Sequence, residues 1–184
     1  MSAIKLKIKK NEGKHDLGVS KFFGRPTLPA EWTDFGDTTI FLLQINLEEI
    51  KDLDKENKLP HEGYLYFFLD VEDEYAISCD VRYYKGIPTV VMDDFNCVVP
   101  GYEQYNDEIL VEFEEVEDEA VGTKLLGVPA DWNYIDEPRK LLLQFDPLDP
   151  GLGIFEYIDG LFYFFFDEKD EKNFEKVTLM EEYS

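Results

Sequence analysis

The chain has 184 residues, of which 44% are hydrophobic and 15% aromatic, a composition typical of a folded domain rather than a disordered segment. It carries 41 acidic residues against 18 basic ones, for a formal net charge of −23. Such a surface should repel nucleic-acid phosphates and anionic lipid headgroups, so we expect neither nucleic-acid nor membrane binding. The charge favours a basic protein as partner, although acidic surfaces also serve solubility alone.

Neither a targeting segment nor a metal motif stands out in the sequence. The start, MSAIKLKIKK, has lysines between its apolar residues and so does not resemble a secretory signal. No apolar run approaches the roughly 20 residues that span a bilayer. Cys79 and Cys97 have no metal-like spacing, and two such thiols fit a reducing compartment. We therefore expect a cytoplasmic protein with no metal and no cofactor.

The first part of the chain predicts strands joined by a structured loop. Residues 4–9, IKLKIK, alternate between apolar and charged side chains, which indicates a strand with one exposed face, and the lysines suit an edge strand. The glycine and prolines of 21–32, KFFGRPTLPAEW, exclude a regular helix and indicate a loop that Trp32 anchors. Residues 38–45 are mostly apolar and β-prone, which predicts a strand buried on both faces.

A short helix and two strands are expected next. Asn46, with Glu49 three residues later, has the capping pattern of a short helix over 47–55. The aromatic run at 64–71 predicts a strand, because broad aromatic side chains fit a pleated surface. Alternation over 75–84 predicts another strand.

The rest of the chain alternates between strand and loop signals. Residues 88–99 predict one or two strands that follow a turn. Residues 108–119 contain seven acidic residues with apolar residues at alternate positions, so we interpret them as an acidic exposed strand, with a helix as the alternative. The prolines and glycines of 146–159 indicate a loop, and 176–182 is the last predicted strand.

Three blocks of sequence occur twice in the same order, which indicates an internal duplication. The pairs are KFFGRPTLPAEW (21–32) with KLLGVPADW (124–132), FLLQIN (41–46) with LLLQFD (141–146), and GYLYFFLD (63–70) with GLFYFFFD (160–167). We predict a mainly β fold, of the β-rich α+β class, in a single domain over 1–184. It would contain two duplicated sheet-rich units with short helices: repeat one at about 20–71, a β-rich middle at about 72–120, and repeat two at about 121–180.

Taken together, the blocks resemble the YwqG-like family of bacterial proteins, a family of unknown function. The likeness covers about 20–177 and rests on seven elements in order: SKFFGRP, a Trp, FLLQIN, LPHEGYLYFF, KLLGVP, LLLQFD and DGLFYFFF. It implies a mostly β fold with a duplicated unit and supplies no catalytic residue, because the family has no established activity. The family tends to carry a pair of glycines where this chain has Phe23 followed by Gly24.

Sequence motifs of catalysis are missing. No glycine-rich loop has the pattern that cradles phosphates. Only His15 and His61 could serve as the base of a nucleophilic triad, and both lie in expected loops. We therefore lean towards a protein that is not an enzyme. The less favoured alternative is a hydrolase that uses Asp70 and Asp167, at matching ends of the two aromatic strands, as paired carboxylates.

Four residues at matching positions of the two copies are candidate ligand-binding residues. Gln44 and Gln144 lie in strands expected to be buried, where an amide must find hydrogen-bond partners. Either each glutamine ties its strand to the neighbouring loop, or the two face a shared cleft between the repeats and orient a small polar ligand. Trp32 and Trp132 either anchor that loop or line the same cleft.

Arg25 and Arg82 are further ligand-binding candidates, because basic residues are scarce outside the N-terminal segment. An arginine presents a planar fork of donors that can hold a carboxylate or phosphate in bidentate fashion. The alternative is that each arginine pairs with one of the many acidic residues nearby.

The acidic segment 103–119 offers a surface rather than a pocket, with aromatic residues among carboxylates, as interfaces with basic proteins often have. Its candidate contact residues are four glutamates: Glu112, Glu114, Glu115 and Glu117. A solvated face is the simpler alternative. Our leading hypothesis is a non-enzymatic interaction protein that binds a basic partner there, for example an immunity protein that neutralises a toxin. The second hypothesis is a small-ligand binding module with a cleft between the repeats.

Overall fold

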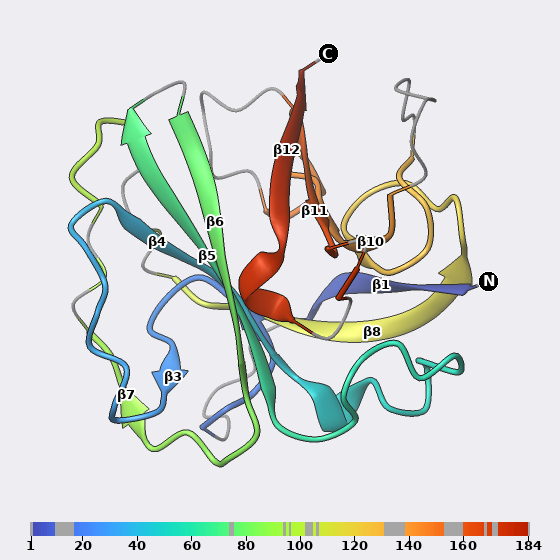
Figure 1. Ribbon diagram of the computed structural model, residues 1–184, viewed down its shortest axis with the longest axis horizontal. Coiled ribbons are helices and arrows are strands. Elements are labelled where there is room, and N and C mark those ends of the chain that lie inside the picture. Colours follow the sequence, from blue (N-terminus) through green and yellow to red (C-terminus); the bar gives the residue numbers. More distant parts are fainter. Residues whose placement is uncertain are drawn as a thin grey trace.

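The fold is built almost entirely from β-strands (Figure 1). The computed structural model describes residues 2–9, 17–73, 76–93, 95, 97–101, 105, 107–130, 139–152, 160–167, 169–170 and 173–183. The strands are β1 (Ser2–Lys9), β2 (Lys21–Phe22), β3 (Thr27–Leu28), β4 (Thr39–Asn46), β5 (Tyr64–Asp73), β6 (Ala76–Tyr84), β7 (Val90–Val91), β8 (Ile109–Glu117), β9 (Lys124–Leu125), β10 (Leu141–Phe145), β11 (Gly160–Phe165) and β12 (Thr178–Tyr183). Within these residues the helical elements are two short 3₁₀ helices, η1 (Leu47–Glu49) and η2 (Phe174–Lys176). The predicted mainly β class is confirmed.

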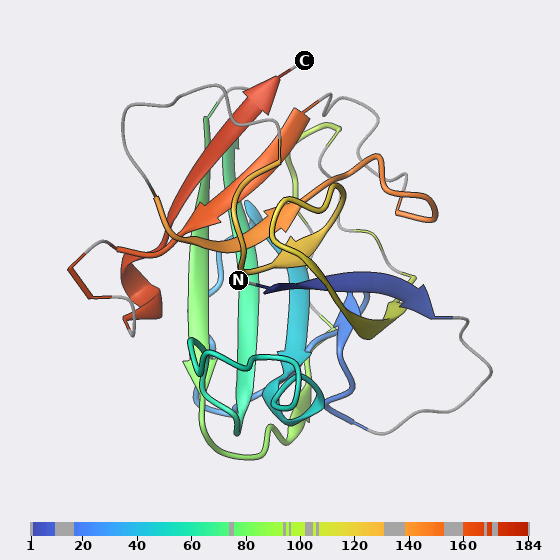
Figure 2. The ribbon, with the colours of Figure 1, turned by 90° about the vertical axis from the view of Figure 1, so that its right-hand side faces the viewer.

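Ten of the strands form one antiparallel sheet that curls until it is nearly closed. Its order is β12-β11-β10-β9-β1-β8-β2-β4-β5-β6, while β3 and β7 form a separate two-stranded sheet. The two edge strands, β6 and β12, contact each other, and η2 lies against β6 (Figures 1 and 2). No helix in the described part of the chain is long and apolar enough to cross a membrane.

The helix predicted over 47–55 is wrong in extent. Asn46 does cap a helical turn, since its side-chain oxygen accepts a hydrogen bond from the backbone N–H of Glu48 at 3.1 Å, but η1 ends after three residues. The buried Asp54 carboxylate accepts hydrogen bonds from the backbone N–H groups of Lys58 and Leu59, at 3.1 and 2.8 Å. An aspartate that binds backbone donors in this way stabilises a turn in place of a helix.

The prediction that residues 4–9 form an edge strand is also wrong. β1 lies in the middle of the sheet, between β8 and β9. Its Lys5 and Lys7 stand directly opposite Glu114 and Glu112 of β8, and Lys7 forms an ion pair with Glu114. Opposite charges on facing positions stabilise a strand pair, so lysines that would protect an edge instead match the acidic strand.

We predict that reversing one of these charges weakens the β1–β8 pair. Lys7→Glu would place an acidic group opposite Glu112 and beside Glu114, so the urea midpoint of unfolding should fall slightly. Adding Glu114→Lys should restore most of the loss, and high salt should reduce both effects. Lys169→Glu is the matched control, because it makes the same charge change at an exposed position outside the strands. An equal loss in the control would contradict a specific cross-strand role.

The central strands connect two similar halves of the sheet. We name β2, β4, β5 and β6 unit one, and β9, β10, β11 and β12 unit two; they flank the β1–β8 pair in mirrored order. β1 precedes unit one in the chain but pairs with β9, whereas β8 precedes unit two but pairs with β2. Unit two is therefore extended by β1, and unit one by β8. Because β1 and β8 pair with each other, they join the two halves in the middle of the sheet.

In unit one, a glutamine and a tyrosine hold one residue of the preceding loop. Gln44 accepts a hydrogen bond from the backbone N–H of Thr27 at 2.9 Å, and its Nε2 donates to the carbonyl of Val19 at 2.8 Å. Tyr66, which faces Gln44 on the neighbouring strand, donates its hydroxyl to the carbonyl of Thr27 at 2.8 Å. Both backbone groups of Thr27 are thus satisfied by side chains, as buried polar groups require.

Unit two repeats this arrangement contact for contact. Gln144 accepts from the backbone N–H of Ala130 at 2.8 Å and donates to the carbonyl of Gly122 at 2.8 Å. Tyr163, which faces Gln144, donates its hydroxyl to the carbonyl of Ala130 at 2.7 Å. We name each pair a Gln–Tyr clamp; the two units hold their preceding loops through matching contacts.

Each loop enters its unit through a left-handed turn. Phe23 and Gly24 have φ angles of 53° and 67°, and the corresponding Leu126 and Gly127 have 60° and 80°. A Cβ atom on Gly127 would lie 2.6 Å from the carbonyl oxygen of Asp118, so glycine is required there. The positive φ at both positions gives a conformational reason for a glycine pair.

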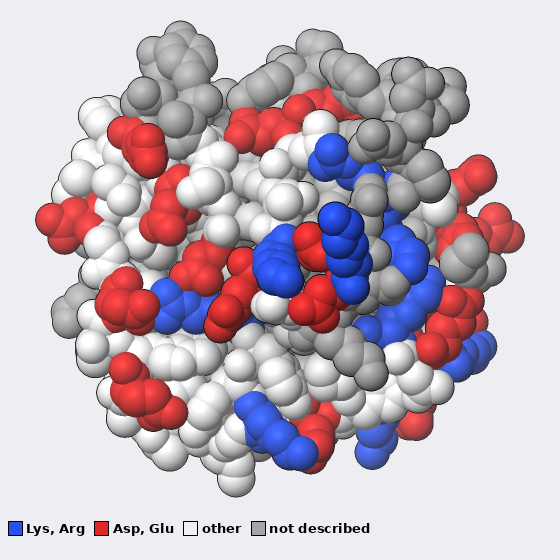
Figure 3. All heavy atoms as spheres, in the orientation of Figure 1, with Lys and Arg blue, Asp and Glu red and all other residues white. Residues whose placement is uncertain are grey.

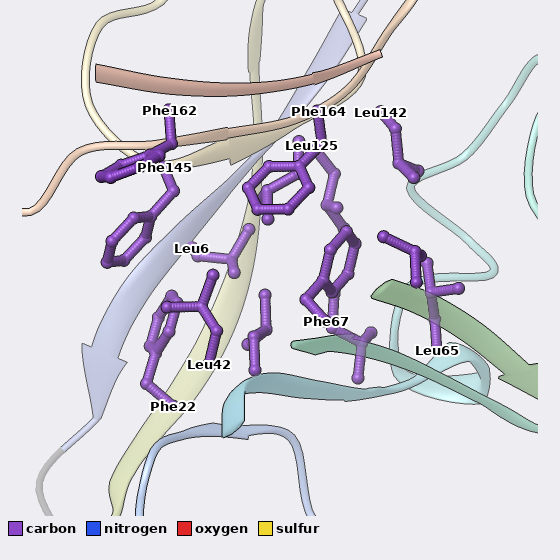
Figure 4. Close-up of a cluster of buried hydrophobic side chains, with 14 of the residues drawn as sticks. Leu6, Phe22, Leu42, Leu65, Phe67, Leu125, Leu142, Phe145, Phe162 and Phe164 are labelled. Atoms are coloured by element: carbon purple, nitrogen blue, oxygen red, sulfur yellow. The ribbon is translucent and has the colours of Figure 1, made fainter. Parts of the chain in front are cut away.

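The main core lies between the two halves of the curled sheet (Figure 4). Phe67 and Phe164, at matching positions of β5 and β11, meet edge to face with ring centres 5.3 Å apart. Phe22 and Phe145 are a second pair from opposite units, at 5.8 Å. Both units therefore bury their inner faces in one shared core. Their outer faces lie away from this core, where loops can cover them.

Candidate functional site

The two glutamines predicted as ligand-binding residues hold loops. Gln44 and Gln144 are both 0% exposed, and both ends of each amide are hydrogen bonded within a Gln–Tyr clamp. Their contacts are those of the loop-tying alternative. Trp132 lies outside the described residues, so its role stays a prediction.

The four glutamates of β8 do not share one face. Successive side chains of a strand point to opposite sides of the sheet, so Glu114 and Glu115 diverge. Glu114 pairs with Lys7 of β1, whereas Glu115 pairs with Lys55 at 2.6 Å. Glu112 and Glu117 likewise lie on opposite sides. The acidic segment therefore presents two partly neutralised faces instead of a single acidic patch.

A hollow at the edge of unit one brings together two of the predicted site residues, Trp32 and Arg82. It has a volume of about 590 Å³ and lies where the 29–38 loop, edge strand β6 and η2 meet. Its lining residues are Glu31, Trp32, Asp34, Asp80, Arg82, Tyr83 and Glu175. Figure 3 shows acidic groups beside basic ones across the middle of this face, over β6 and η2. We call this cavity the edge hollow.

Strand periodicity and register place Arg82 in the edge hollow. Asp80 and Arg82 are two residues apart on β6, so their side chains share one face. Gln44, Tyr66 and Arg82 lie opposite one another on the neighbouring strands β4, β5 and β6. The hollow therefore lies at the β6 end of the cross-strand row that contains the Gln–Tyr clamp. Asp80 stands opposite Phe68.

Aromatic rings hold the guanidinium of Arg82 on one side. Its central carbon lies 4.7 Å from the ring centre of Phe35, 5.3 Å from that of Trp32 and 5.9 Å from that of Phe68. Trp32 in turn packs edge to face on Tyr66 at 5.3 Å. These contacts attach the 29–38 loop to the outer face of the sheet, and the cation–π geometry favours a guanidinium there.

Two carboxylates bind the other edges of the Arg82 guanidinium. Asp34 accepts two hydrogen bonds from it, at 2.8 and 3.1 Å, and Asp80 accepts one from Nε at 2.7 Å. Burial lowers the pKa of Arg82, but these hydrogen bonds and charges outweigh burial, so the net shift is upward. The hydrogen bonds from Arg82 lower the pKa of Asp34. Both groups therefore carry full charge at neutral pH.

The same positions in unit two lack this charge arrangement. Strand register places Met180 of β12 opposite Tyr163, as Arg82 is opposite Tyr66. Thr178 occupies the position that corresponds to Asp80. The two units thus share a frame, but the described residues of β12 hold no counterpart of Arg82 or Asp80 at these two positions.

The remaining predicted residues have local partners. Arg25 donates to Asp93 at 2.9 Å, in a pair whose side chains are 67% and 64% exposed. Asp70 accepts a hydrogen bond from the Thr39 hydroxyl at 2.6 Å, and Asp167 accepts one from the backbone N–H of Lys169 at 3.0 Å. Asp70 lies within β5 and pairs across the sheet with Thr39, whereas the bond of Asp167 is typical of a turn.

His61 also has a structural partner, while His15 lies outside the described residues. A ring nitrogen of His61 is 3.2 Å from the buried carboxylate of Asp54, which already organises the turn after η1. Among the described residues, no group of three or more histidine, cysteine or acidic side chains is arranged to hold a metal ion.

Five of the described lining residues of the edge hollow do not stand out in the sequence: Glu31, Asp34, Asp80, Tyr83 and Glu175. The spacing of Asp80 and Arg82 in a predicted strand was a usable signal, because period two puts them on one face. Glu175 carried no such signal, since it meets β6 only because the sheet nearly closes.

These features define a mainly β protein with a nearly closed sheet and an acidic, aromatic-walled hollow at one edge. Residues 20–96 match the model of a family described as a domain of unknown function, DUF1963. The matched part contains β2 to β7 and every lining residue of the edge hollow except Glu175. No curated protein matches the chain. Over this part, the chain is similar to a family without a described function.

Proposed function

We propose that this protein is a non-enzymatic binding module whose edge hollow takes up a cationic group of a basic protein partner. The observation that carries the proposal is the charge of the lining: its described residues include four carboxylates and one guanidinium, a formal excess of three negative charges. A hollow with low-dielectric walls concentrates such a potential and attracts counter-charges.

An anionic ligand fits the edge hollow less well. Arg82 is the only basic residue among the described lining residues, and Asp34 and Asp80 already bind it. A carboxylate or phosphate would have to displace Asp34 and would then lie near Glu31 and Glu175. Repulsion between like charges makes such a complex unfavourable.

The charge states favour binding over proton transfer. A general acid or base works best with a pKa near the working pH. The pKa of Asp34 is lowered and that of Arg82 is raised, so both stay charged near neutrality. Burial raises the pKa of Cys79 to about 12, which disfavours a thiolate nucleophile on the same strand.

The charge of the whole chain supports the same kind of partner. A net charge of −23 would speed the approach of a basic protein by long-range attraction. An immunity protein that neutralises a basic toxin is one concrete form of this function. The YwqG-like resemblance and the DUF1963 match supply no activity that competes with it.

The test compares capture of partners from a lysate of the source organism by three immobilised proteins. The hollow variant carries Glu31→Gln with Glu175→Gln, at two exposed lining positions. The control variant carries Glu112→Gln with Glu117→Gln, which removes the same charge from β8. A basic protein should be retained by the wild type and the control, be released by high salt, and be lost from the hollow variant.

Three results would contradict the proposal. Equal retention by the hollow variant would show that the edge hollow is not the binding site, and loss from the control variant alone would assign binding to β8. If the wild-type column retains no basic protein, the proposed basic protein partner does not exist in that lysate and the proposal fails. Thermal unfolding of each variant must match the wild type, so that loss of binding is not loss of folding.

A further inference from the structure

The edge hollow already contains one guanidinium, and the way it is held indicates which cation the site can recognise. We propose that the hollow binds an arginine side chain of the partner in preference to a lysine side chain. This inference rests on the proposed function and names the chemical group that the hollow would take up.

An aromatic side chain in the lining favours a planar cation. A guanidinium is planar and stacks on ring faces, whereas an ammonium is a compact point charge. Trp32 lines the hollow and is only half-buried, so part of its indole remains accessible. Trp32 and Phe35 already hold the Arg82 guanidinium with ring centres at 5.3 and 4.7 Å. A second flat cation would find a suitable surface on the accessible part of the Trp32 indole.

The carboxylates of the edge hollow come from separate elements of the fold. Glu31 and Asp34 belong to the 29–38 loop, Asp80 to β6, and Glu175 to η2. Asp34 uses both oxygens for Arg82, yet its side chain is 70% exposed, so further lone pairs face the solvent. Carboxylates on separate elements suit a ligand with donors along several edges, and a guanidinium has five donors in a fixed fork.

Hydration also favours a guanidinium over an ammonium. A cation that enters a partly enclosed hollow must give up part of its water shell, and a guanidinium is more weakly hydrated than an ammonium. The cost of desolvation is therefore smaller for arginine. The volume of about 590 Å³ is that of a typical ligand pocket, which leaves room for the backbone that carries the side chain.

The experiment measures the binding of three blocked peptides to the full chain by isothermal titration calorimetry at low ionic strength. The peptides have one sequence and differ only in two positions, which hold arginine, lysine or the uncharged isostere citrulline. We expect the arginine peptide to bind roughly tenfold or more tightly than the lysine peptide, and the citrulline peptide to show no binding.

Variants connect this preference to the hollow. Glu31→Gln with Glu175→Gln should weaken the arginine peptide about tenfold, whereas Glu112→Gln with Glu117→Gln should leave it unchanged. Trp32→Leu should reduce the ratio of arginine to lysine affinity while the carboxylates still bind both peptides. Thermal unfolding and circular dichroism check that Trp32→Leu retains the fold.

The outcomes separate this inference from the proposed function. Equal, hollow-dependent binding of the arginine and lysine peptides would overturn the arginine preference and leave a cation-binding module. Tight arginine binding that the hollow variant does not weaken would overturn the assignment of the site. Lack of binding by both cationic peptides, in the presence of hollow-dependent capture of a basic protein, would overturn the inference alone.

Discussion

Replacing Gln144 by leucine is expected to lower the free energy of unfolding by about 2–5 kcal/mol, even though leucine has a similar volume. The amide satisfies the backbone N–H of Ala130 and the carbonyl of Gly122 in buried hydrogen bonds. Leucine would leave both backbone groups without a partner, and an unsatisfied buried group costs about 1–3 kcal/mol. Gln44→Leu should act in the same direction at Thr27.

Urea unfolding followed by fluorescence measures the effect, with the slope used to check two-state behaviour. Leu143→Met is the matched control, because it changes the neighbouring, equally buried residue of β10 and conserves volume. Such a swap usually costs less than about 1.5 kcal/mol. If Gln144→Leu costs no more than this control, the Gln–Tyr clamp does not stabilise the unit.

A rise in pH from 8 to 9.5 is expected to stabilise the wild type, relative to a Lys124→Met variant, by on the order of 2 kcal/mol. Lys124 is 0% exposed, and its amino group donates to the carbonyls of Asp118 and Val128, each at 2.7 Å. Burial lowers the pKa of Lys124 to about 8, against the opposing charges of Asp118 and Glu119. Lys5 contributes to the decrease.

The direction follows from proton binding in the two states. The pKa of an unfolded lysine is about 10.4, so above pH 8 the unfolded chain binds more protons at Lys124 than the folded chain does. Stability then increases with pH through this window. Burial is the main cause that raises the pKa values of Tyr64 and Tyr83. Ionisation of these tyrosines therefore lowers the stability as the pH rises near 10, so the measured range ends at about pH 9.5.

The measurement is a series of urea unfolding curves at closely spaced pH values. Comparison with Lys124→Met cancels the titration of all other groups that the two proteins share. Lys51→Met removes an exposed lysine and should keep the wild-type slope. Parallel pH dependence of the wild type and Lys124→Met would show that the buried amine does not titrate in this range.

Much of the strand content could be predicted because it depends on local patterns. The apolar run at 38–45 and the aromatic run at 64–71 appear as β4 and β5, displaced by no more than two residues at either end. Side-chain type and period alone favour strands at such places. The helix at 47–55 failed, because the capping pattern at Asn46 is also local but the hydrogen bonds of Asp54 compete with it.

The candidate site could be predicted only in part. Trp32 and Arg82 were chosen for their chemistry, and they do meet, but the residues around them come from a loop, a strand and a short helix far apart in the chain. Arg25 was chosen on the same grounds and lies elsewhere with Asp93. Residue type indicates what a side chain can bind, whereas its neighbours depend on register and packing.

The sequence by itself determined the mainly β class and the acidic character of the chain, because strand formation follows from side-chain pattern and charge from composition. Tertiary structure decided that β1 is central, that each unit is extended by the other's leading strand, and that β6 and β12 meet. These features depend on pairings between residues more than a hundred positions apart, such as Lys7 with Glu112. No local signal specifies such a pairing, so the edge hollow exists only once the sheet has curled.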